Sequence, residues 1–327
     1  MNPAANRLII HMGLHKTGTT SIQTFFSEFR DAISAAGLYY PESGCMRQEG
    51  AHHNIYRFYS QNADERSRFN PQIGGGAELI SEIELLDKNV LLSSEGFWVL
   101  ARDEPERFVE FVQGVRQNRK VLFLITWRNA AEYCESLYFQ AAKTKQMVGI
   151  DTAVRWFFSM PNEFEKVVKF VSTEIDADTV IVQYGKDMIG IFTDLFAKSL
   201  KIDIDRNLVR RREENVSLSP AQKVIAAHLS LAKIRLEPKV YKEILDSFGE
   251  GTSDHASGEG KSIMPESIQE KLIRASVQGL RNIVENSRTV SLYPEHLPDQ
   301  FKTRPCLMGD PGVFTFPKLR SALEAVQ

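Results

Sequence analysis

The stretch HMGLHKTGTTSI, residues 11–22, decides the fold of this chain. It continues a short apolar run, Arg7 to Met12, and leads into a segment whose apolar residues recur at helical spacing. A strand that runs into a Gly- and Thr-rich turn and then into a helix directs several backbone N–H groups, and the positive end of the helix dipole, at one point. The sequence therefore predicts a phosphate-binding loop between a strand and a helix.

Within this loop, glycine, lysine and hydroxyl side chains supply the groups that bind a phosphate. Gly13 and Gly18 permit close approach of the backbone, and Lys16 adds a positive charge. His15 is expected to shape the loop or to face the phosphate. The hydroxyl groups expected to donate further hydrogen bonds belong to Thr17, Thr19, Thr20 and Ser21.

The loop differs from the ATP/GTP pattern GxxxxGK[ST] at one informative position. Thr19 stands where that pattern has its lysine, and the lysine of this loop, Lys16, comes three residues earlier. In nucleoside triphosphatases the lysine of the pattern reaches the β- and γ-phosphates. A loop without it suits a ligand that carries one 5′-phosphoryl group and no further phosphates. A small-molecule kinase that uses ATP and Mg²⁺ is the alternative enzyme.

Three further short apolar runs predict strands, at Asn89 to Ser93, Lys120 to Thr126 and Thr179 to Gln183. They alternate with segments of helical period, which is the pattern of βαβ units and a parallel sheet. Strands that are covered on both faces are apolar nearly throughout, as these are. The expected fold is α/β, a three-layer P-loop NTPase-like fold whose central parallel sheet is flanked by helices, with a helical C-terminal elaboration.

Residues 1–327 are expected to form a single domain. Residues 1–205 are its cofactor-binding core, and residues 206–327 are expected to be mostly helical, with a long helix that begins at Ser219-Pro220. From Glu250 to Ser262 the sequence is rich in Gly, Ser and charge and nearly lacks apolar side chains. That composition predicts a flexible surface loop.

The charge balance excludes a general role in binding polyanions. Lys and Arg number 40 against 42 Asp and Glu, so the formal net charge is -2, and neither nucleic acid nor an anionic membrane is an expected partner. No apolar stretch reaches the ~20 residues of a membrane helix, and the N-terminus has no secretion signal. Three distant cysteines without a CxxC pair provide no zinc site and favour a reducing compartment. We therefore expect a cytoplasmic protein. The sequence gives no prediction of its oligomeric state.

A second motif, WRNAAEYCESLY at residues 127–138, follows the third predicted strand. Arg128 and Ser136 are eight positions apart, and Tyr138 completes an RxxxxxxxSxY pattern. Together with the loop sequence HKTGTTS, this pattern resembles the sulfotransferases that use 3′-phosphoadenosine 5′-phosphosulfate (PAPS). The resemblance covers roughly the first half of the chain and implies that Arg128 and Ser136 hold the 3′-phosphate. A phosphate dianion suits a guanidinium and a hydroxyl donor.

The resemblance implies transfer of the sulfuryl group from PAPS to a hydroxyl or amine. Glu95 and the loop from Glu250 to Ser262 favour a carbohydrate or other small polar acceptor. The resemblance also implies that Lys16 stabilises the departing 5′-phosphate, and the reaction requires no metal in principle. A basic stretch of such enzymes also touches the 3′-phosphate. Arg210-Arg211-Arg212 is the candidate for this part here, and the alternative is that the run only forms a solvated surface. The alternative to an enzyme is a non-catalytic nucleotide-binding module of the same fold.

Glu95 is the first candidate for the base that takes the acceptor proton. It follows the second predicted strand in NVLLSSE, and it lies beside the phosphate loop if the first two predicted strands are neighbours. Carbohydrate-acting sulfotransferases use a glutamate base, whereas cytosolic alcohol- and phenol-acting ones use a histidine. The alternatives are that Glu95 is only a helix-start carboxylate, or that a histidine of the pair His52-His53 acts, with His53 as the base or as a substrate contact.

Overall fold

The computed structural model describes residues 6–143, 163–175, 177–185, 187–205 and 266–295, with isolated positions between 208 and 264 and at 303–304. The chain divides into two compact units. The first contains Met1–Arg128, Glu163–Arg212 and Arg281–Leu297, and the second contains Asn129–Asn162, Glu213–Leu280 and Pro298–Gln327. Each unit is therefore assembled from segments that are distant in the sequence.

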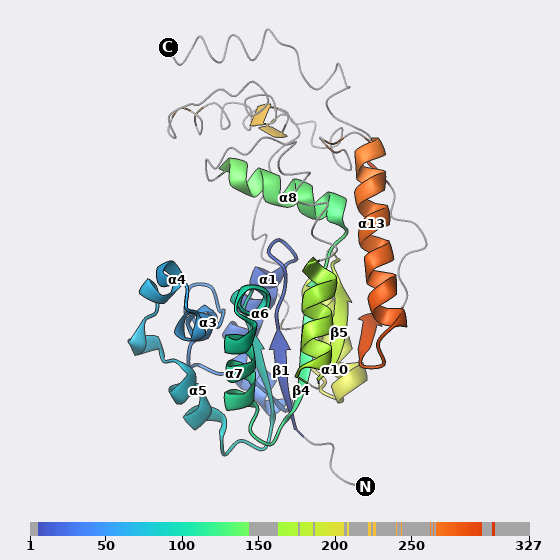
Figure 1. Ribbon diagram of the computed structural model, residues 1–327. Helices are drawn as coiled ribbons and strands as arrows, with labels where there is room; N and C mark the ends of the chain where they lie inside the picture. Colours follow the sequence, from blue (N-terminus) through green and yellow to red (C-terminus); the bar gives the residue numbers. More distant parts are fainter. Residues whose placement is uncertain are drawn as a thin grey trace. The chain divides into compact units, whose positions relative to one another are not determined.

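The first unit is built on a six-stranded parallel sheet in the order β2-β3-β1-β4-β5-β6 (Figure 1). The four predicted strands are its inner ones, each correct to within one residue at either end. They are β1 (Arg7–His11), β3 (Asn89–Ser93), β4 (Lys120–Trp127) and β5 (Asp178–Gln183). Strand β1 lies between β3 and β4, which confirms that the first two predicted strands are neighbours.

The two edge strands, β2 (Leu38–Tyr39) and β6 (Val290–Tyr293), were not predicted from the sequence. The first has only two residues, and in the second one buried residue is followed by three accessible ones. Neither gives the continuous apolar run of a strand that is covered on both faces.

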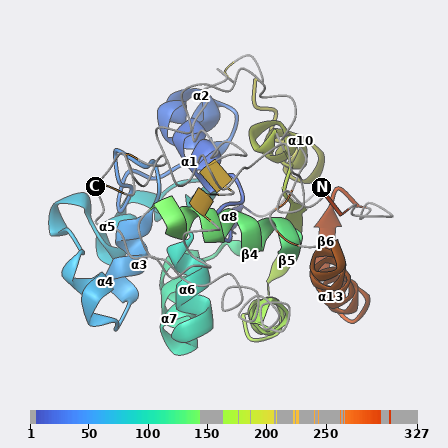
Figure 2. The same cartoon turned by 90° about the horizontal axis from the view of Figure 1, so that it is seen from above.

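Helices cover both faces of the sheet and form three layers with it (Figure 2). On one face lie α1 (Thr19–Glu28), α2 (Arg30–Ala35) and α10 (Met188–Leu200). Their aromatic side chains, such as Phe26 and Phe192, form a buried cluster with Ile9 and Leu124 of the sheet. This packing fixes the start of α1, and with it the loop that precedes it.

The opposite face is covered by α6 (Gly96–Asp103), α7 (Pro105–Arg116) and a helix of residues 163–173. The ring centroid of Phe108 lies 5.8 Å from that of Phe123 on β4 and 6.3 Å from that of Phe170. Between β2 and β3 the chain forms α3 (His53–Tyr59), α4 (Ala63–Ser67), the 3-10 helix η1 (Pro71–Ile73) and α5 (Gly76–Ile83).

In the second unit, α8 (Ala130–Lys143) carries a buried carboxylate that joins distant parts of the sequence. Glu135 accepts hydrogen bonds from Ser262 Oγ and from Arg304 Nη2, both at 2.7 Å, and Lys223 Nζ lies 3.5 Å away. Helix α13 (Glu266–Glu285) begins in this unit and ends in the first. Most of the helix predicted from Ser219, and of the loop predicted up to Ser262, lies outside the described residues.

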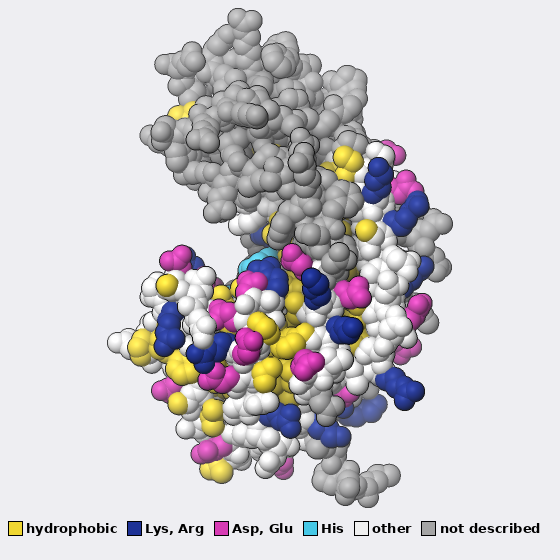
Figure 3. Space-filling model, in the orientation of Figure 1, with side chains coloured by type: hydrophobic (Ala, Val, Ile, Leu, Met, Phe, Trp, Pro, Cys, Tyr) yellow, Lys and Arg dark blue, Asp and Glu magenta, His cyan; other side chains and the backbone are white. Residues whose placement is uncertain are grey.

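Positive and negative side chains are interspersed over the described surface in Figure 3, in keeping with the net charge of -2. Within the part of the chain that the structure describes, no helix combines the length and the apolar character needed to cross a membrane. Cys45 and Cys134 are buried free thiols, and Cys306 lies outside the described residues.

Candidate functional site

The predicted phosphate loop leaves the carboxyl end of β1 and turns sharply into α1. The backbone N–H of Met12 still donates to the Leu124 carbonyl of β4, at 3.0 Å. Lys16 and Gly18 then take left-handed backbone conformations, with φ of 63° and 76°. Turns that contain left-handed residues bring successive N–H groups into a concave arrangement that suits an anion. The turn between β1 and α1 therefore contains two left-handed residues, and its role as a phosphate-binding loop stays a prediction.

Gly18 is required at the end of this loop for two reasons. Its positive φ disfavours any residue with a Cβ atom, and a Cβ placed there would lie 2.7 Å from Cγ of Met188 on α10. Gly18 is also the N-cap residue of α1, and no side chain caps the helix at that position. The N–H groups of the first helical turn have no acceptor within the helix, so they are available to an anion.

The loop side chains divide into those that face outward and those that bind the protein. His15 and Thr20 are exposed, and Lys16 and Ser21 are partly exposed. These four stay candidates for direct contact with a phosphate. Lys16, in particular, would add a cation to a site formed by the backbone N–H groups.

Two of the predicted phosphate contacts, Thr17 and Thr19, direct their hydroxyl groups inward. The Thr17 hydroxyl donates to the Leu14 carbonyl at 2.6 Å and lies 2.6 Å from the hydroxyl of Thr126 on β4. The Thr19 hydroxyl donates to Glu95 Oε1. Both hydroxyls thus fix the loop to the sheet edge, and a phosphate contact by either residue would use its backbone N–H.

Glu95 lies beside the phosphate loop, as its place after β3 predicted. Besides the bond from Thr19 to Oε1, its Oε2 atom accepts a hydrogen bond from Gln23 Nε2 at 2.9 Å. Glu95 is only 7% exposed. It occupies the N-cap position of α6, but its side chain makes no capping hydrogen bond there. The carboxylate is therefore directed at the loop and at α1 rather than at the helix that it begins.

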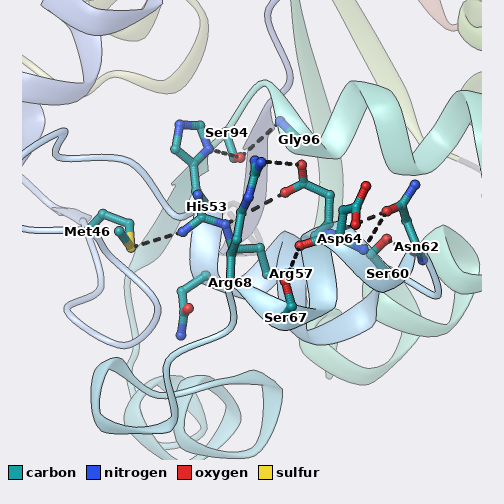
Figure 4. Close-up of polar contacts among 12 residues, drawn as sticks. Met46, His53, Arg57, Ser60, Asn62, Asp64, Ser67, Arg68, Ser94 and Gly96 are labelled. Carbon is teal, nitrogen blue, oxygen red and sulfur yellow. Dashed lines mark hydrogen bonds and ion pairs between the residues drawn. The ribbon is translucent and has the colours of Figure 1, made fainter.

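His53, the rival base, is the first residue of α3 and contacts Glu95 directly. Its Nδ1 atom lies 2.7 Å from Ser94 Oγ, which also accepts a hydrogen bond from the backbone N–H of Gly96 (Figure 4). Its Nε2 atom lies 3.6 Å from Glu95 Oε2 and 3.5 Å from Glu49 Oε2. The two candidate bases are thus neighbours in one cluster.

The surroundings of this pair favour an ionised carboxylate and a neutral imidazole. Burial alone would raise the pKa of Glu95, but the nearby His53 and the hydrogen bonds from Thr19 and Gln23 lower it below its usual value of 4.5. Burial lowers the pKa of His53 below 6.5, although Glu95 and Glu49 oppose that shift. Glu95 is therefore in the form that accepts a proton near neutral pH.

His52 has a structural role and is separate from the cluster. Its ring is fully buried, with Nε2 3.1 Å from the Pro41 carbonyl and Nδ1 accepting from the backbone N–H of Ser93 at 3.1 Å. Burial lowers the pKa of His52 to about 4. Among the residues with a described structure, no group of three or more His, Cys, Asp or Glu side chains is arranged to hold a metal ion.

Arg128 follows β4 and contacts the phosphate loop. Glu95 comes after β3, the other neighbour of β1. The Nη1 atom of Arg128 donates to the backbone carbonyl of Lys16 at 3.0 Å. The guanidinium carbon lies 4.3 Å from the centre of the Tyr184 ring, which follows β5. The hydrogen bond and the cation–π contact hold the guanidinium at the carboxyl edge of the sheet, where ligands of open α/β sheets bind.

The second predicted contact of the 3′-phosphate, Ser136, lies on α8 and is partly exposed. It belongs to the second unit, whereas Arg128 is the last residue of a segment of the first. A shared role for these two residues stays a prediction. The basic run Arg210-Arg211-Arg212 lies outside the described residues.

Three residues of this region were missed in the sequence. Gln23 follows Thr19 by one helical turn, and this spacing puts its polar side chain on the same face of α1 as Thr19. The sequence alone could therefore have indicated Gln23 as part of the site. Glu49 and Tyr184 gave no such indication, because one lies in a polar turn and the other after a strand, and only the tertiary structure brings them to His53 and Arg128.

No protein-family model, no curated protein and no solved structure matches this chain.

Proposed function

We propose that this protein is a PAPS-dependent sulfotransferase of the P-loop α/β type. It would transfer the sulfuryl group to a hydroxyl or amine, with a carbohydrate or other small polar acceptor preferred. The observation that supports this most is the hydrogen bond from Thr19 to Glu95. That bond holds a buried carboxylate, ionised near neutral pH, directly against the turn that contains the left-handed residues Lys16 and Gly18.

The residues of the site fit a nucleotide with a 5′-phosphosulfate and a 3′-phosphate. The uncapped start of α1 and the Lys16 side chain would hold the 5′-phosphate, with His15, Thr20 and Ser21 as further accessible contacts. Arg128 would bind the 3′-phosphate, since a guanidinium matches phosphate geometry. When bound, the co-substrate supplies the sulfuryl group and an anionic leaving group.

The protein groups then have separate tasks in the transfer. The Glu95 carboxylate removes the proton from the acceptor hydroxyl or amine as that atom attacks sulfur. Lys16 and the loop N–H groups stabilise the negative charge that builds up on the departing phosphate. Thr19 and Gln23 keep the carboxylate in one orientation, so that the base is preorganised.

Nucleotide binding is the first test of this proposal. Millimolar 3′-phosphoadenosine 5′-phosphate, at about 100 times its dissociation constant, should raise the melting temperature by about 5 °C, because a ligand that binds only the folded state stabilises it. Arg128→Ala should remove most of that shift. Arg107→Ala, which removes an exposed arginine on α7 paired with Glu110, is the matched control and should keep it.

An unchanged melting temperature for the wild-type protein would show that the cofactor assignment is wrong. A shift produced by ATP only when Mg²⁺ is present would favour the kinase. Nucleotide binding without transfer from radiolabelled PAPS to any member of a broad acceptor panel would favour the non-catalytic module.

The base is tested by comparing Glu95→Gln with His53→Ala. Loss of a general base slows transfer by about 10² to 10⁴, so single-turnover transfer should fall by that factor in Glu95→Gln while nucleotide binding persists. Wild-type rates in Glu95→Gln together with a large loss in His53→Ala would assign the base to His53 instead.

A further inference from the structure

Glu49 connects the buried cluster around Glu95 with solvent. It lies in a tight turn between Met46 and Ala51, in which Met46 N–H donates to the Ala51 carbonyl at 2.8 Å. Its side chain is 51% exposed, and its Oε2 atom lies 3.5 Å from His53 Nε2. The same nitrogen is 3.6 Å from Glu95 Oε2. One imidazole nitrogen thus lies between a buried carboxylate and an exposed one.

The position of Glu95 creates a need for such a connection. A carboxylate that has taken a proton from an acceptor must lose it before the next turnover. Glu95 is nearly buried, and both of its oxygens are engaged by side chains of α1, Thr19 and Gln23. His53, whose side chain is 22% exposed, lies between this carboxylate and Glu49.

We propose that His53 and Glu49 form the path by which the proton leaves Glu95 for solvent. This inference rests on the proposed function, in which Glu95 is the base. In the first step the O–H bond at Glu95 Oε2 breaks and an N–H bond forms at His53 Nε2, which leaves a carboxylate and an imidazolium. In the second step that N–H bond breaks, an O–H bond forms at Glu49 Oε2, and the neutral imidazole returns. Glu49 then releases the proton to water.

Ser94 allows His53 to change its protonation state without losing its position. A hydroxyl has two acceptor lone pairs and one donor. The N–H of Gly96 takes one lone pair of Ser94 Oγ, at 3.0 Å, and the other can accept from Nδ1–H of His53, at 2.7 Å. That tautomer leaves the lone pair on Nε2, the nitrogen that lies closest to the two carboxyl groups and accepts the proton in the first step.

Burial is the main cause that lowers the pKa of His53, and four ionisable groups also act on it. Glu95 and Glu49 favour the imidazolium, whereas Arg57 of the same helix and His15 of the phosphate loop oppose it. Removal of one carboxylate should therefore shift the titration of His53 without abolishing it. Because Glu49 acts through His53, its role is one of proton transfer and positioning, and it need not contact the acceptor.

The test uses NMR of the full-length protein with ¹⁵N-labelled histidine. In Glu49→Gln the pKa of His53 should fall by about one unit, since a charge 3.5 Å away is lost. Exchange of the Nε2 proton of the His53 imidazolium with water should slow by about tenfold or more, as expected when an acid–base group is removed, and added imidazole buffer should restore it. The matched control, Glu110→Gln on α7, also neutralises a half-exposed carboxylate and should change neither quantity.

An unchanged His53 titration in Glu49→Gln would overturn the proposal. So would a shifted pKa with an unchanged exchange rate, because the contact would then be an ion pair without a transfer role. Both measurements are made without nucleotide or acceptor. Failure of the sulfotransferase proposal would instead appear as the absence of a melting-temperature shift with 3′-phosphoadenosine 5′-phosphate.

Discussion

At the scale of single residues, three consecutive side chains hold the candidate site together. Ser93 Oγ lies 2.8 Å from Nδ1 of His11 on β1, and Ser94 Oγ lies 2.7 Å from Nδ1 of His53 on α3. Glu95 continues the series with its bonds to the phosphate loop and to α1. The end of β3 therefore contacts three other parts of the first unit with three successive residues.

Gly50 provides the first residue-scale prediction. Its φ is 67°, and a Cβ atom there would lie 2.6 Å from the carbonyl oxygen of Gln23. Gly50→Ala should lower the free energy of unfolding by about 3 kcal/mol, the sum of a left-handed backbone cost and of overpacking. Urea unfolding measures this change.

The control for that substitution is Gly37→Ala. Gly37 also has a positive φ, 96°, but no described atom lies within 4 Å of the place that a Cβ atom would take. The free energy of unfolding of Gly37→Ala should therefore fall only by the cost of the left-handed backbone, about 1 kcal/mol. Equal losses in the two variants would show that the turn of Glu49 does not pack against α1.

At the scale of elements, the inner strands were predictable because burial on both faces makes them continuously apolar. The loop and the start of α1 were predictable as well, because Gly18 and the hydroxyl residues around it form a local pattern. The direction of the hydroxyl groups was not predictable. Thr17 and Thr19 bind Thr126 and Glu95, which are distant in the sequence, so only the tertiary structure decides whether a loop hydroxyl faces a ligand or the protein.

The pair of candidate bases illustrates the same limit. The positions of Glu95 after β3 and of His53 in a polar segment were evident from the sequence, and both appeared there as rivals. Their contact arises because α3 packs beside the carboxyl end of β3, where Ser94 binds the His53 ring. Local sequence patterns contain no information about that packing.

Helix α8 provides the element-scale prediction. Glu135 is 4% exposed and faces Lys223, Ser262 and Arg304. Glu135→Gln leaves two partly buried cations without a counter-charge and should destabilise the second unit by about 3 kcal/mol. Hydrogen exchange in α8, followed by mass spectrometry, should become faster.

The comparison for this substitution is Glu270→Gln on α13. Glu270 pairs with Arg274 at 2.8 Å, but both side chains are well exposed, so its loss should cost less than about 1 kcal/mol. Similar exchange in the two variants would mean that the Glu135 cluster does not stabilise the second unit.

At the scale of the whole molecule, buried neutral histidines make stability depend on pH. Burial lowers the pKa of both His11 and His52 from 6.5 to about 4. Between these values the unfolded chain binds more protons than the folded one, so the free energy of unfolding should fall as the pH drops from 6.5 to 4. Each histidine contributes roughly 3 kcal/mol to this loss, which ends below about pH 4.

Urea unfolding at several pH values measures this dependence. His52→Gln removes one titrating group and should reduce the slope between pH 6.5 and 4, whatever its effect on stability at pH 7. A slope equal to that of the wild-type protein would show that His52 is not held neutral by the fold.

The order of segments in the first unit has a consequence for synthesis of the chain. Strand β5 ends at Gln183, and its parallel partner β6 begins only at Val290. At usual elongation rates the ribosome needs about 5 to 20 s to make the intervening residues. Throughout that interval the nascent sheet has an open edge of unpaired N–H and C=O groups at β5, which is the kind of edge that pairs with other chains. Folding during translation should therefore depend on chaperones that cover this edge until residues 281–297 emerge.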